Sequence, residues 1–302
     1  MSEARRGVLL GFAAYAMWGV FPLYWPLLEP AGAGEILTHR IVWSALVTAA
    51  LVLLIGRRGA MRGLLRDRRA RLLLTVAAGL VSANWLTYIW AVNNGRVVES
   101  SLGYFINPLV SVFLGVMVLG ERLRPVQTAA LGLATAAVGV LTLEYGRLPW
   151  VALVLALSFG GYGLVKKVAG VGAVESLAFE TAVAAPVAAA YLGWLALSGA
   201  ATFGSGGTTH SLLLASTGLI TAAPLVCFGA AAIRVRLVTL GLLQYVAPTL
   251  QFLLGVWWFR EAMTGGRWIG FALVWSALAV FTIDAVRHHR REIADAAAAA
   301  AF

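Results

Sequence analysis

The sequence contains few charged residues and a single cysteine. Charged side chains make up 12% of the 302 residues, about half of the roughly 25% that is typical of soluble globular proteins. Together with a hydrophobic content of 61%, this excludes an ordinary soluble domain and indicates a membrane protein. Cys227 is the lone cysteine, which excludes an intramolecular disulfide and the usual cysteine-rich metal sites.

Motifs for catalysis and for nucleotide binding are also missing from the sequence. It offers no Ser/His/Asp constellation and no metal-ligand spacing. The glycines of "KKVAGVGAVES" and "FGSGGTTH" lack the strand-loop-helix setting that a phosphate-binding site requires. We therefore expect a protein that is not an enzyme, that binds no cofactor or metal, and that draws no energy from a nucleotide-binding module of its own.

What the sequence does contain is a series of apolar segments. A helix needs about 20 apolar residues to cross a bilayer core of about 30 Å. Ten segments meet this requirement: residues 7–27, 36–56, 72–92, 100–120, 126–144, 149–167, 175–197, 211–232, 238–259 and 267–286. No cleavage site follows the first segment, so we interpret it as a retained helix. The predicted fold class is an all-α polytopic membrane protein with ten transmembrane helices.

The basic residues indicate how these segments are oriented. Lys and Arg outnumber Asp and Glu by 23 to 13. If the N-terminus is cytoplasmic, every cytoplasmic connection carries at least two basic residues. The outer side retains only Arg40, Arg96, Arg147, Arg260 and Arg267. This asymmetry follows the positive-inside rule and predicts that both termini are cytoplasmic.

Arginines are densest in "RRGAMRGLLRDRRAR" (57–71). We interpret this segment as a topology determinant that contacts anionic lipid, in preference to a nucleic-acid site. A basic and alanine-rich cytoplasmic tail, 287–302, follows the last span.

One stretch of the sequence occurs twice. A Pro, Gly and Glu triplet recurs 140 residues further on without a gap: Pro108, Gly115 and Glu121 correspond to Pro248, Gly255 and Glu261. The chain is thus predicted to consist of two five-helix halves, 1–145 and 146–286. Because five is odd, the second half enters the membrane from the opposite side. Such inverted repeats are typical of secondary transporters, which bind substrate near the midplane between paired, Pro-interrupted helices.

Polar and aromatic side chains at helical spacing are the candidates for a substrate pathway. The predicted pathway residues are Tyr15, Trp18, Asn84, Tyr88, Tyr104, Asn107, Pro108, Ser111, Tyr162, Gln244, Tyr245, Pro248 and Gln251. The alternative is that these groups only bridge neighbouring helices. Gly266 and Gly270 form a GxxxG pair that fits either a homodimer contact or packing inside the protein.

Two charged residues within spans are candidates for coupling or gating. A carboxylate at the bilayer centre costs roughly 2.5–3.5 kcal/mol on insertion scales, so Glu180 is a candidate proton-coupling site. The alternatives are an acid close enough to the cytoplasmic edge to reach water, or the partner of Lys166 or Lys167. Arg40 attracts an anionic substrate group, locks an outer gate against an acid such as Glu99, or snorkels to the interface. The sequence alone leaves these alternatives open.

The same stretches carry a family resemblance. "AYAMWGVFPLYW", "EILTHRIVWS", "NWLTYIWAVNNGRVVESSLGYFINPL" and "LGLLQYVAPTLQF" resemble the RarD proteins of the EamA branch of the drug/metabolite transporter superfamily. The similarity runs from about residue 7 to 286. It implies a bacterial inner-membrane transporter with ten helices in two EamA repeats and a central cavity lined by both. Arg40, Asn107 and Pro108 stand where the family pattern expects them.

We therefore expect a secondary active transporter that exports or exchanges small amphipathic metabolites or drugs by alternating access around a midplane cavity. The alternative is a membrane-embedded receptor or regulatory partner that binds a ligand without moving it. The lack of a soluble signalling domain speaks against that alternative.

Overall fold

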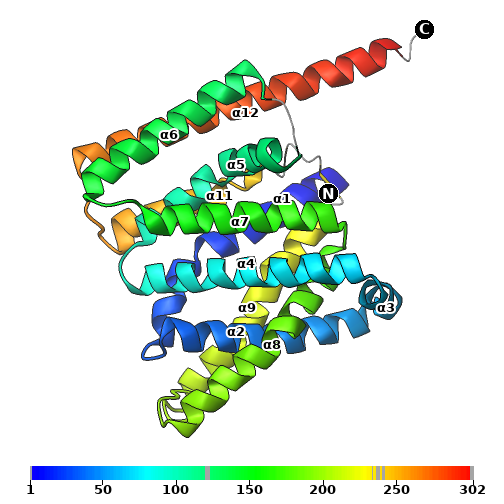
Figure 1. Ribbon diagram of the computed structural model, residues 1–302, viewed down its shortest axis with the longest axis vertical. Coiled ribbons are helices and arrows are strands. Elements are labelled where there is room, and N and C mark those ends of the chain that lie inside the picture. Colours follow the sequence, from blue (N-terminus) through cyan, green and yellow to red (C-terminus); the bar gives the residue numbers. More distant parts are fainter. Residues whose placement is uncertain (1, 120–122, 233, 236–238, 240–241, 300–302) are drawn as a thin grey trace.

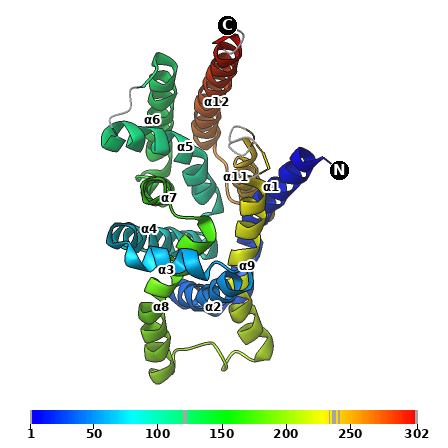
Figure 2. The same ribbon diagram turned by 90° about the vertical axis from the view of Figure 1, so that its right-hand side faces the viewer.

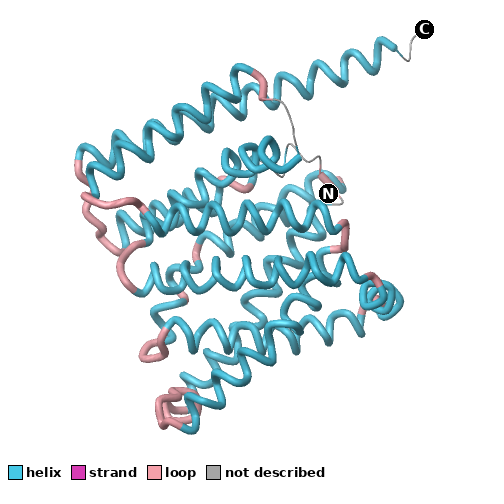
Figure 3. Tube along the Cα trace, in the orientation of Figure 1, coloured by secondary structure: helices cyan, strands magenta, loops and turns pink. Residues whose placement is uncertain are grey.

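The computed structural model describes residues 2–119, 123–232, 234–235, 239 and 242–299, and the regular structure in this part of the chain is helical (Figure 3). The helices are α1 (Glu3–Gly19), α2 (Ala33–Leu54), α3 (Arg58–Arg66), α4 (Arg68–Asn93), α5 (Val97–Leu119), α6 (Pro125–Tyr145), α7 (Trp150–Ala169), α8 (Ala173–Leu197), α9 (Thr208–Ala232), α11 (Val246–Leu253) and α12 (Gly265–Ala299). Two short 3₁₀ turns, Phe21–Leu23 and Trp25–Leu28, follow α1, and a π turn, Leu254–Trp258, follows α11.

Nine helices among the described residues are long and apolar enough to cross a membrane. They coincide with nine of the expected spans, so the chain is a polytopic α-helical membrane protein. The remaining expected span, 238–259, corresponds to a shorter apolar helix, Val246–Trp258. Part of that span lies outside the described residues. Leu54, Leu143 and Leu197 are 84%, 85% and 93% exposed, as expected of side chains that face lipid.

The first span differs from the expected helix over 7–27. The α-helix ends at Gly19, and the chain continues in the two 3₁₀ turns. Pro22 and Pro26 are each the second residue of their turn, where a missing N–H and a fixed φ are tolerated, whereas either would break a continuing α-helix. The turns fold inward, so that Trp25 and Leu28 are completely buried.

The two prolines of the repeated triplet also differ in their local structure. Pro108 lies inside α5, which remains one helix through it. Pro248 is the third residue of α11, in the first turn, where its missing N–H removes no helical hydrogen bond. Equivalent sequence positions therefore produce an internal proline in one helix and a helix start in the other.

The helices form two rows, which Figure 2 shows from the side. One row packs in the order α6, α5, α7, α4 and α8, and the other contains α12, α11, α1, α9 and α2. The rows contact each other through α2 with α8, α5 with α11, and α6 with α12. The start of α1, the arginine-rich α3 and the far end of α12 all lie on the same side of the bundle (Figure 1).

The contact between α6 and α12 accounts for the GxxxG pair. A carbon added at Gly266 or Gly270 would overlap Glu144 or Leu141 of α6. Both glycines therefore allow close packing within the chain, and their face of α12 is not free to form a homodimer. Trp257 and Trp258, at the end of the ninth span, are 72% and 69% exposed, which suits side chains at a membrane interface.

Candidate functional site

Arg40 is the most deeply buried cation in the described part of the chain. It lies seven residues into α2, about 10 Å from the start of the helix at 1.5 Å per residue. Its side chain reaches into the space between the two rows, and only 3% of the residue is exposed. Its Nε donates a hydrogen bond of 2.9 Å to Oγ1 of Thr221 on α9, the only hydrogen bond that it makes with the described residues.

Aromatic rings surround the Arg40 guanidinium. Its central carbon lies 3.9 Å from the ring centroid of Trp85 on α4, which places the guanidinium against the indole face. The corresponding distances to Trp25 and Phe21, from the 3₁₀ turns, are 5.2 and 5.8 Å. Desolvated cation–π contacts contribute about 2 kcal/mol or more, so these rings offset part of the cost of removing the charge from water.

Tyrosine hydroxyls form the polar part of the same environment. Tyr24, Tyr88 and Tyr104 all lie close enough to interact electrostatically with Arg40. Tyr104 donates to Oδ1 of Asn84 at 3.0 Å, and Tyr24 donates to the Leu213 carbonyl at 2.6 Å. The hydroxyl of Tyr88 is buried and has no hydrogen-bond partner among the described residues.

Arg40 has no acidic partner among the described residues, because the nearby buried acids are paired elsewhere. Glu99 accepts from Arg147 at 2.7 Å and from the backbone N–H of Val151 at 3.2 Å, which caps the start of α7. Glu35 accepts from the backbone N–H groups of Thr202 and Phe203. The alternative in which Arg40 locks a gate against Glu99 does not fit this structure. Snorkelling does not fit either, because the charge points inward.

Buried hydroxyl groups continue from Arg40 along α2. Ser44 follows one turn later and is completely buried, and its hydroxyl has no partner among the described residues. Thr48 comes one turn after that and lies 3.3 Å from Thr181 of α8, measured between the hydroxyl oxygens. The row of polar groups runs towards the side of the bundle that carries α3, the start of α1 and the far end of α12.

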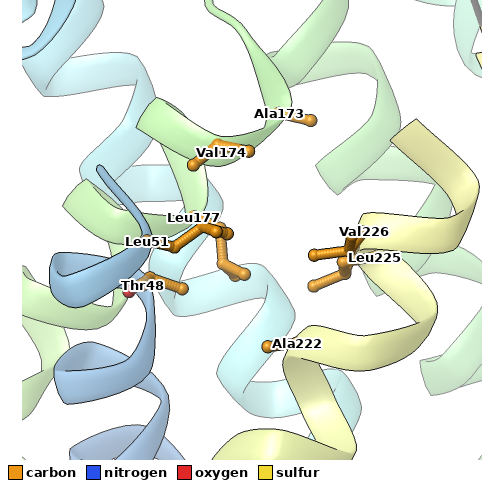
Figure 4. Close-up of a pocket in the computed structure, with 8 residues that line it drawn as sticks. All are labelled: Thr48, Leu51, Ala173, Val174, Leu177, Ala222, Leu225 and Val226. Carbon is orange, nitrogen blue, oxygen red and sulfur yellow. The ribbon is translucent and has the colours of Figure 1, made fainter. Parts of the chain in front are cut away.

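A hollow lies at the end of this row, between α2, α8 and α9 (Figure 4). Its walls are Thr48, Leu51, Ala173, Val174, Leu177, Ala222, Leu225 and Val226. Ala222 directly follows Thr221, the hydrogen-bond partner of Arg40. The mainly apolar hollow therefore lies close to the buried cation along both helices: Ala222 is next to Thr221 on α9, and Thr48 is two turns after Arg40 on α2.

The structure brings three predicted pathway residues together beside Arg40. Asn84 accepts from Tyr104, and Tyr88 packs edge-on against Tyr104 with ring centroids 5.6 Å apart. Asn84 also donates to the Leu155 carbonyl and to Ser158 of α7, so it joins α4, α5 and α7. The hydrogen bonds of this group bridge neighbouring helices, and its role in a substrate pathway stays a prediction.

The other predicted pathway residues lie away from Arg40. Tyr15 and Trp18 form an aromatic cluster with Phe228 of α9, at centroid distances of 5.4 to 6.0 Å. Gln251 donates to the Trp18 carbonyl at 3.2 Å, while its side-chain oxygen has no partner among the described residues. These contacts join α1 to α9 and α11.

Polar groups near the two prolines are more dispersed. Asn107 is half-buried, and its side-chain oxygen lacks a partner in the described part of the chain and faces Gly160 of α7. Ser111 is exposed and Gln244 half-buried. Tyr245 lies 3.5 Å from Thr282 of α12, measured between the hydroxyl oxygens.

Glu180 is held in an ion pair. Its carboxylate accepts from Nζ of Lys166 at 3.0 Å and from the hydroxyl of Tyr162 at 3.0 Å. Lys166 also donates to Ser176. Among the alternatives for Glu180, the geometry shows pairing with Lys166, and Tyr162 belongs to this cluster rather than to the Arg40 site.

Glu261 lies outside the spans and caps the start of α5. The first N–H groups of α5, those of Val97 and Val98, donate to its carboxylate. Burial raises the pKa of Glu261 to about 7, although these backbone hydrogen bonds oppose the shift. Its repeat counterpart, Glu121, lies outside the described residues.

Sequence reasoning missed Trp25, Trp85 and Thr221 as neighbours of Arg40. Trp85 could have been singled out, because a tryptophan well inside a span is far from the interface where this residue usually lies. Thr221 carried no comparable signal, because it is 181 residues away from Arg40 in the chain.

Comparisons with known proteins give a consistent family. The model of the EamA-like transporter family matches residues 5–143. The chain is 57% identical to the protein RarD of Streptomyces exfoliatus, over 99% of this chain and 95% of that one. It is 44% identical to RarD of Escherichia coli (strain K12), over 96% and 98% of the two chains. It is 45% identical to an uncharacterized transporter of Pseudomonas aeruginosa, over 96% and 97%.

A solved crystal structure has the same fold, with a TM-score of 0.60 at 22% sequence identity, over 92% of this chain and 97% of the other. The sequence relatives that are 44% to 57% identical over nearly the whole chain identify the family. The chain belongs to the RarD proteins, within the EamA-like transporter family of the drug/metabolite transporter superfamily.

Proposed function

We propose that the protein is a secondary active transporter that exports or exchanges small amphipathic metabolites or drugs across the bacterial inner membrane. It works by alternating access between two inverted five-helix repeats, 1–145 and 146–286. The family is one of membrane transporters, and the buried polar residues between the two rows of helices support a substrate site there.

The observation that carries this proposal is the order of helix packing. Suppose that each helix of the first half is exchanged with its counterpart in the second: α1 with α7, α2 with α8, α4 with α9, α5 with α11 and α6 with α12. The contact of α5 with α7 then becomes that of α11 with α1, and the contact of α4 with α7 becomes that of α9 with α1. The contacts of α2 with α8, α5 with α11 and α6 with α12 map onto themselves. This supports two repeats related by a pseudo-two-fold axis, along which substrate is expected.

The proposed orientation puts both ends of the chain in the cytoplasm. The start of α1, the end of α12 and the arginine-rich α3 lie on one side of the bundle (Figure 1). An arginine-rich segment on that side favours the cytoplasmic face with its anionic lipids. On this assignment the hollow opens in the cytoplasmic half and Arg40 lies in the outer half.

Sided labelling of a single cysteine tests alternating access. Cys227 is replaced by serine and Ser44 by cysteine, and an impermeant thiol reagent is added to right-side-out or inside-out vesicles. Val187→Cys, on the lipid-facing side of α8 and 75% exposed in the protein alone, is the matched control. We expect Ser44→Cys to react from both faces and Val187→Cys from neither. Reaction of Ser44→Cys from one face only would instead support a receptor with a fixed entrance.

A further inference from the structure

We infer that Arg40 is the binding site for the carboxylate of a small organic anion with a single negative charge and an aromatic or otherwise apolar body. The inference deepens the proposed transport function by naming its substrate class. The binding step, however, is measurable without transport.

The first argument is the charge balance of the buried site. A guanidinium removed from water is unfavourable unless an anion or a full set of hydrogen bonds replaces the lost hydration. The groups that face Arg40 are hydroxyls and rings from α4, α5, α9 and the 3₁₀ turns, and the described residues add no carboxylate. The rings and hydroxyls offset part of the penalty, and a bound anion completes the balance.

The second argument is the set of free hydrogen-bond donors. A guanidinium has five N–H donors in one plane, and its outer edge matches the two oxygens of a carboxylate. Nε is occupied by Thr221 and one face is covered by Trp85, while the two Nη groups make no hydrogen bond with the described residues. The unpaired hydroxyl of Tyr88 is a further donor for the same anion.

The third argument concerns the rest of the ligand. Trp25, Phe21 and Tyr88 supply aromatic surface around the charge, which fits a planar apolar body. Arg40 is the only cation of this site in the described part of the chain, so a dianion such as hydrogen phosphate would leave one charge uncompensated. The described residues beside it also lack a carboxylate for an ammonium group, which favours a simple carboxylate over an amine.

The inferred path of the ligand runs from Arg40 towards the hollow. Ser44, whose hydroxyl is buried and unpaired, lies one turn from Arg40 towards the hollow. A ligand leaving Arg40 in that direction meets a hydroxyl for its carboxylate and then the apolar walls of the hollow for its body. Both groups are of the kind that an amphipathic anion requires.

Equilibrium binding to the purified, full-length protein tests this site. Radiolabelled phenylacetate is the probe, and unlabelled indole-3-acetate, phenylacetamide, phenethylamine and inorganic phosphate are the competitors. We expect indole-3-acetate to displace the probe and the other three to be at least 10-fold weaker. If the wild-type protein binds phenylacetate no better than phenylacetamide, the inference is wrong.

Variants separate the roles of the individual groups. We expect Arg40→Gln to abolish binding, and Arg40→Lys to weaken it at least 10-fold, because lysine keeps the charge but lacks the planar fork. Tyr88→Phe keeps the ring and the fold but removes the free hydroxyl, so we expect a 3- to 10-fold loss. Tyr88→Phe tests the site even if the Arg40 variants do not fold.

Arg96→Gln is the matched control. Arg96 also packs against tryptophan rings, those of Trp90 and Trp150, but it lies outside the Arg40 site. We expect its variant to bind phenylacetate like the wild-type protein, and equal losses in Arg40→Gln and Arg96→Gln would overturn the assignment. Binding without any flux in liposomes would count against the transport function and leave the site intact. Flux of neutral solutes without carboxylate binding would overturn the assignment of the Arg40 site and leave the transport function intact.

Discussion

Gly218 on α9 offers a sharp test of how the Arg40 site is held together. A Cβ at this position would lie 2.6 Å from the backbone carbon and oxygen of Trp43 on α2, and ordinary contact begins at 3.4 Å. Gly218→Ala therefore has to push α2 and α9 apart by about 0.8 Å, because a backbone cannot turn aside as a flexible side chain can. The displaced segments include Arg40 and Thr221, whose hydrogen bond of 2.9 Å joins the same two helices.

The magnitude follows from two opposing effects. Overpacking costs typically 1–3 kcal/mol. Replacing glycine by alanine inside a helix gains about 1 kcal/mol. Gly229 is the control, because it lies on the same helix and a Cβ there meets nothing within 4 Å. We expect Gly229→Ala to match or exceed the wild-type thermal stability in lipid or detergent. Gly218→Ala should lie about 0–2 kcal/mol below the wild type, and therefore about 1–3 kcal/mol below Gly229→Ala.

The assay is thermal unfolding of the purified protein, combined with phenylacetate binding for each variant. Gly218→Ala should also bind more weakly, since α9 carries the partner of Arg40. If Gly218→Ala is as stable as Gly229→Ala and binds normally, the close packing of α2 against α9 does not position the site, and the reasoning is refuted.

Three further predictions concern buried polar groups. Because burial raises the pKa of Glu261 to about 7, the folded state binds its proton more tightly than the unfolded chain does. Stability should therefore fall by about 1–3 kcal/mol as the pH rises from about 4.5 through 7, and Glu261→Gln should flatten this dependence in pH-resolved melting curves. Glu180→Gln leaves Lys166 without its anionic partner and should destabilise the protein by about 1–3 kcal/mol, whereas the double variant Glu180→Gln/Lys166→Gln should recover part of the loss. A double variant that is less stable than both single variants would contradict the ion pair. Tyr104→Phe leaves the Asn84 oxygen without its donor and should cost about 1 kcal/mol by chemical or thermal unfolding, and an unchanged midpoint would argue against that hydrogen bond.

Hydropathy predicted most of the fold because the membrane simplifies the problem. Backbone groups in lipid have to be paired within a helix, so length and apolarity alone locate the spans. The errors occurred where local chemistry overrides this rule. Pro22 and Pro26 end the first helix early, and Pro248 begins a helix while Pro108 sits inside one. A proline removes one helical hydrogen bond and clashes with the turn before it, but only if the helix has already started there. The sequence does not show where each helix starts relative to its proline.

The site was predictable only in part, for a related reason. Arg40, Asn84, Tyr88 and Tyr104 could be identified because polar groups and tyrosines within spans are conspicuous. Their partners could not, because pairing between helices depends on rotation and tilt, which hydropathy does not report. Glu99 was a plausible partner for Arg40 by charge, but it is paired with Arg147, which lies three residues before the start of α7.

Flux in liposomes tests the central claim of a transporter most directly. The purified protein is reconstituted and challenged with a panel of amphipathic solutes, with and without a pH gradient, and each solute is assayed in parallel for binding. We predict that at least one solute that binds also crosses the membrane in a protein-dependent manner, and that Arg40→Gln abolishes the flux of carboxylates. If every solute that binds stays on its side of the membrane, the protein is not a transporter.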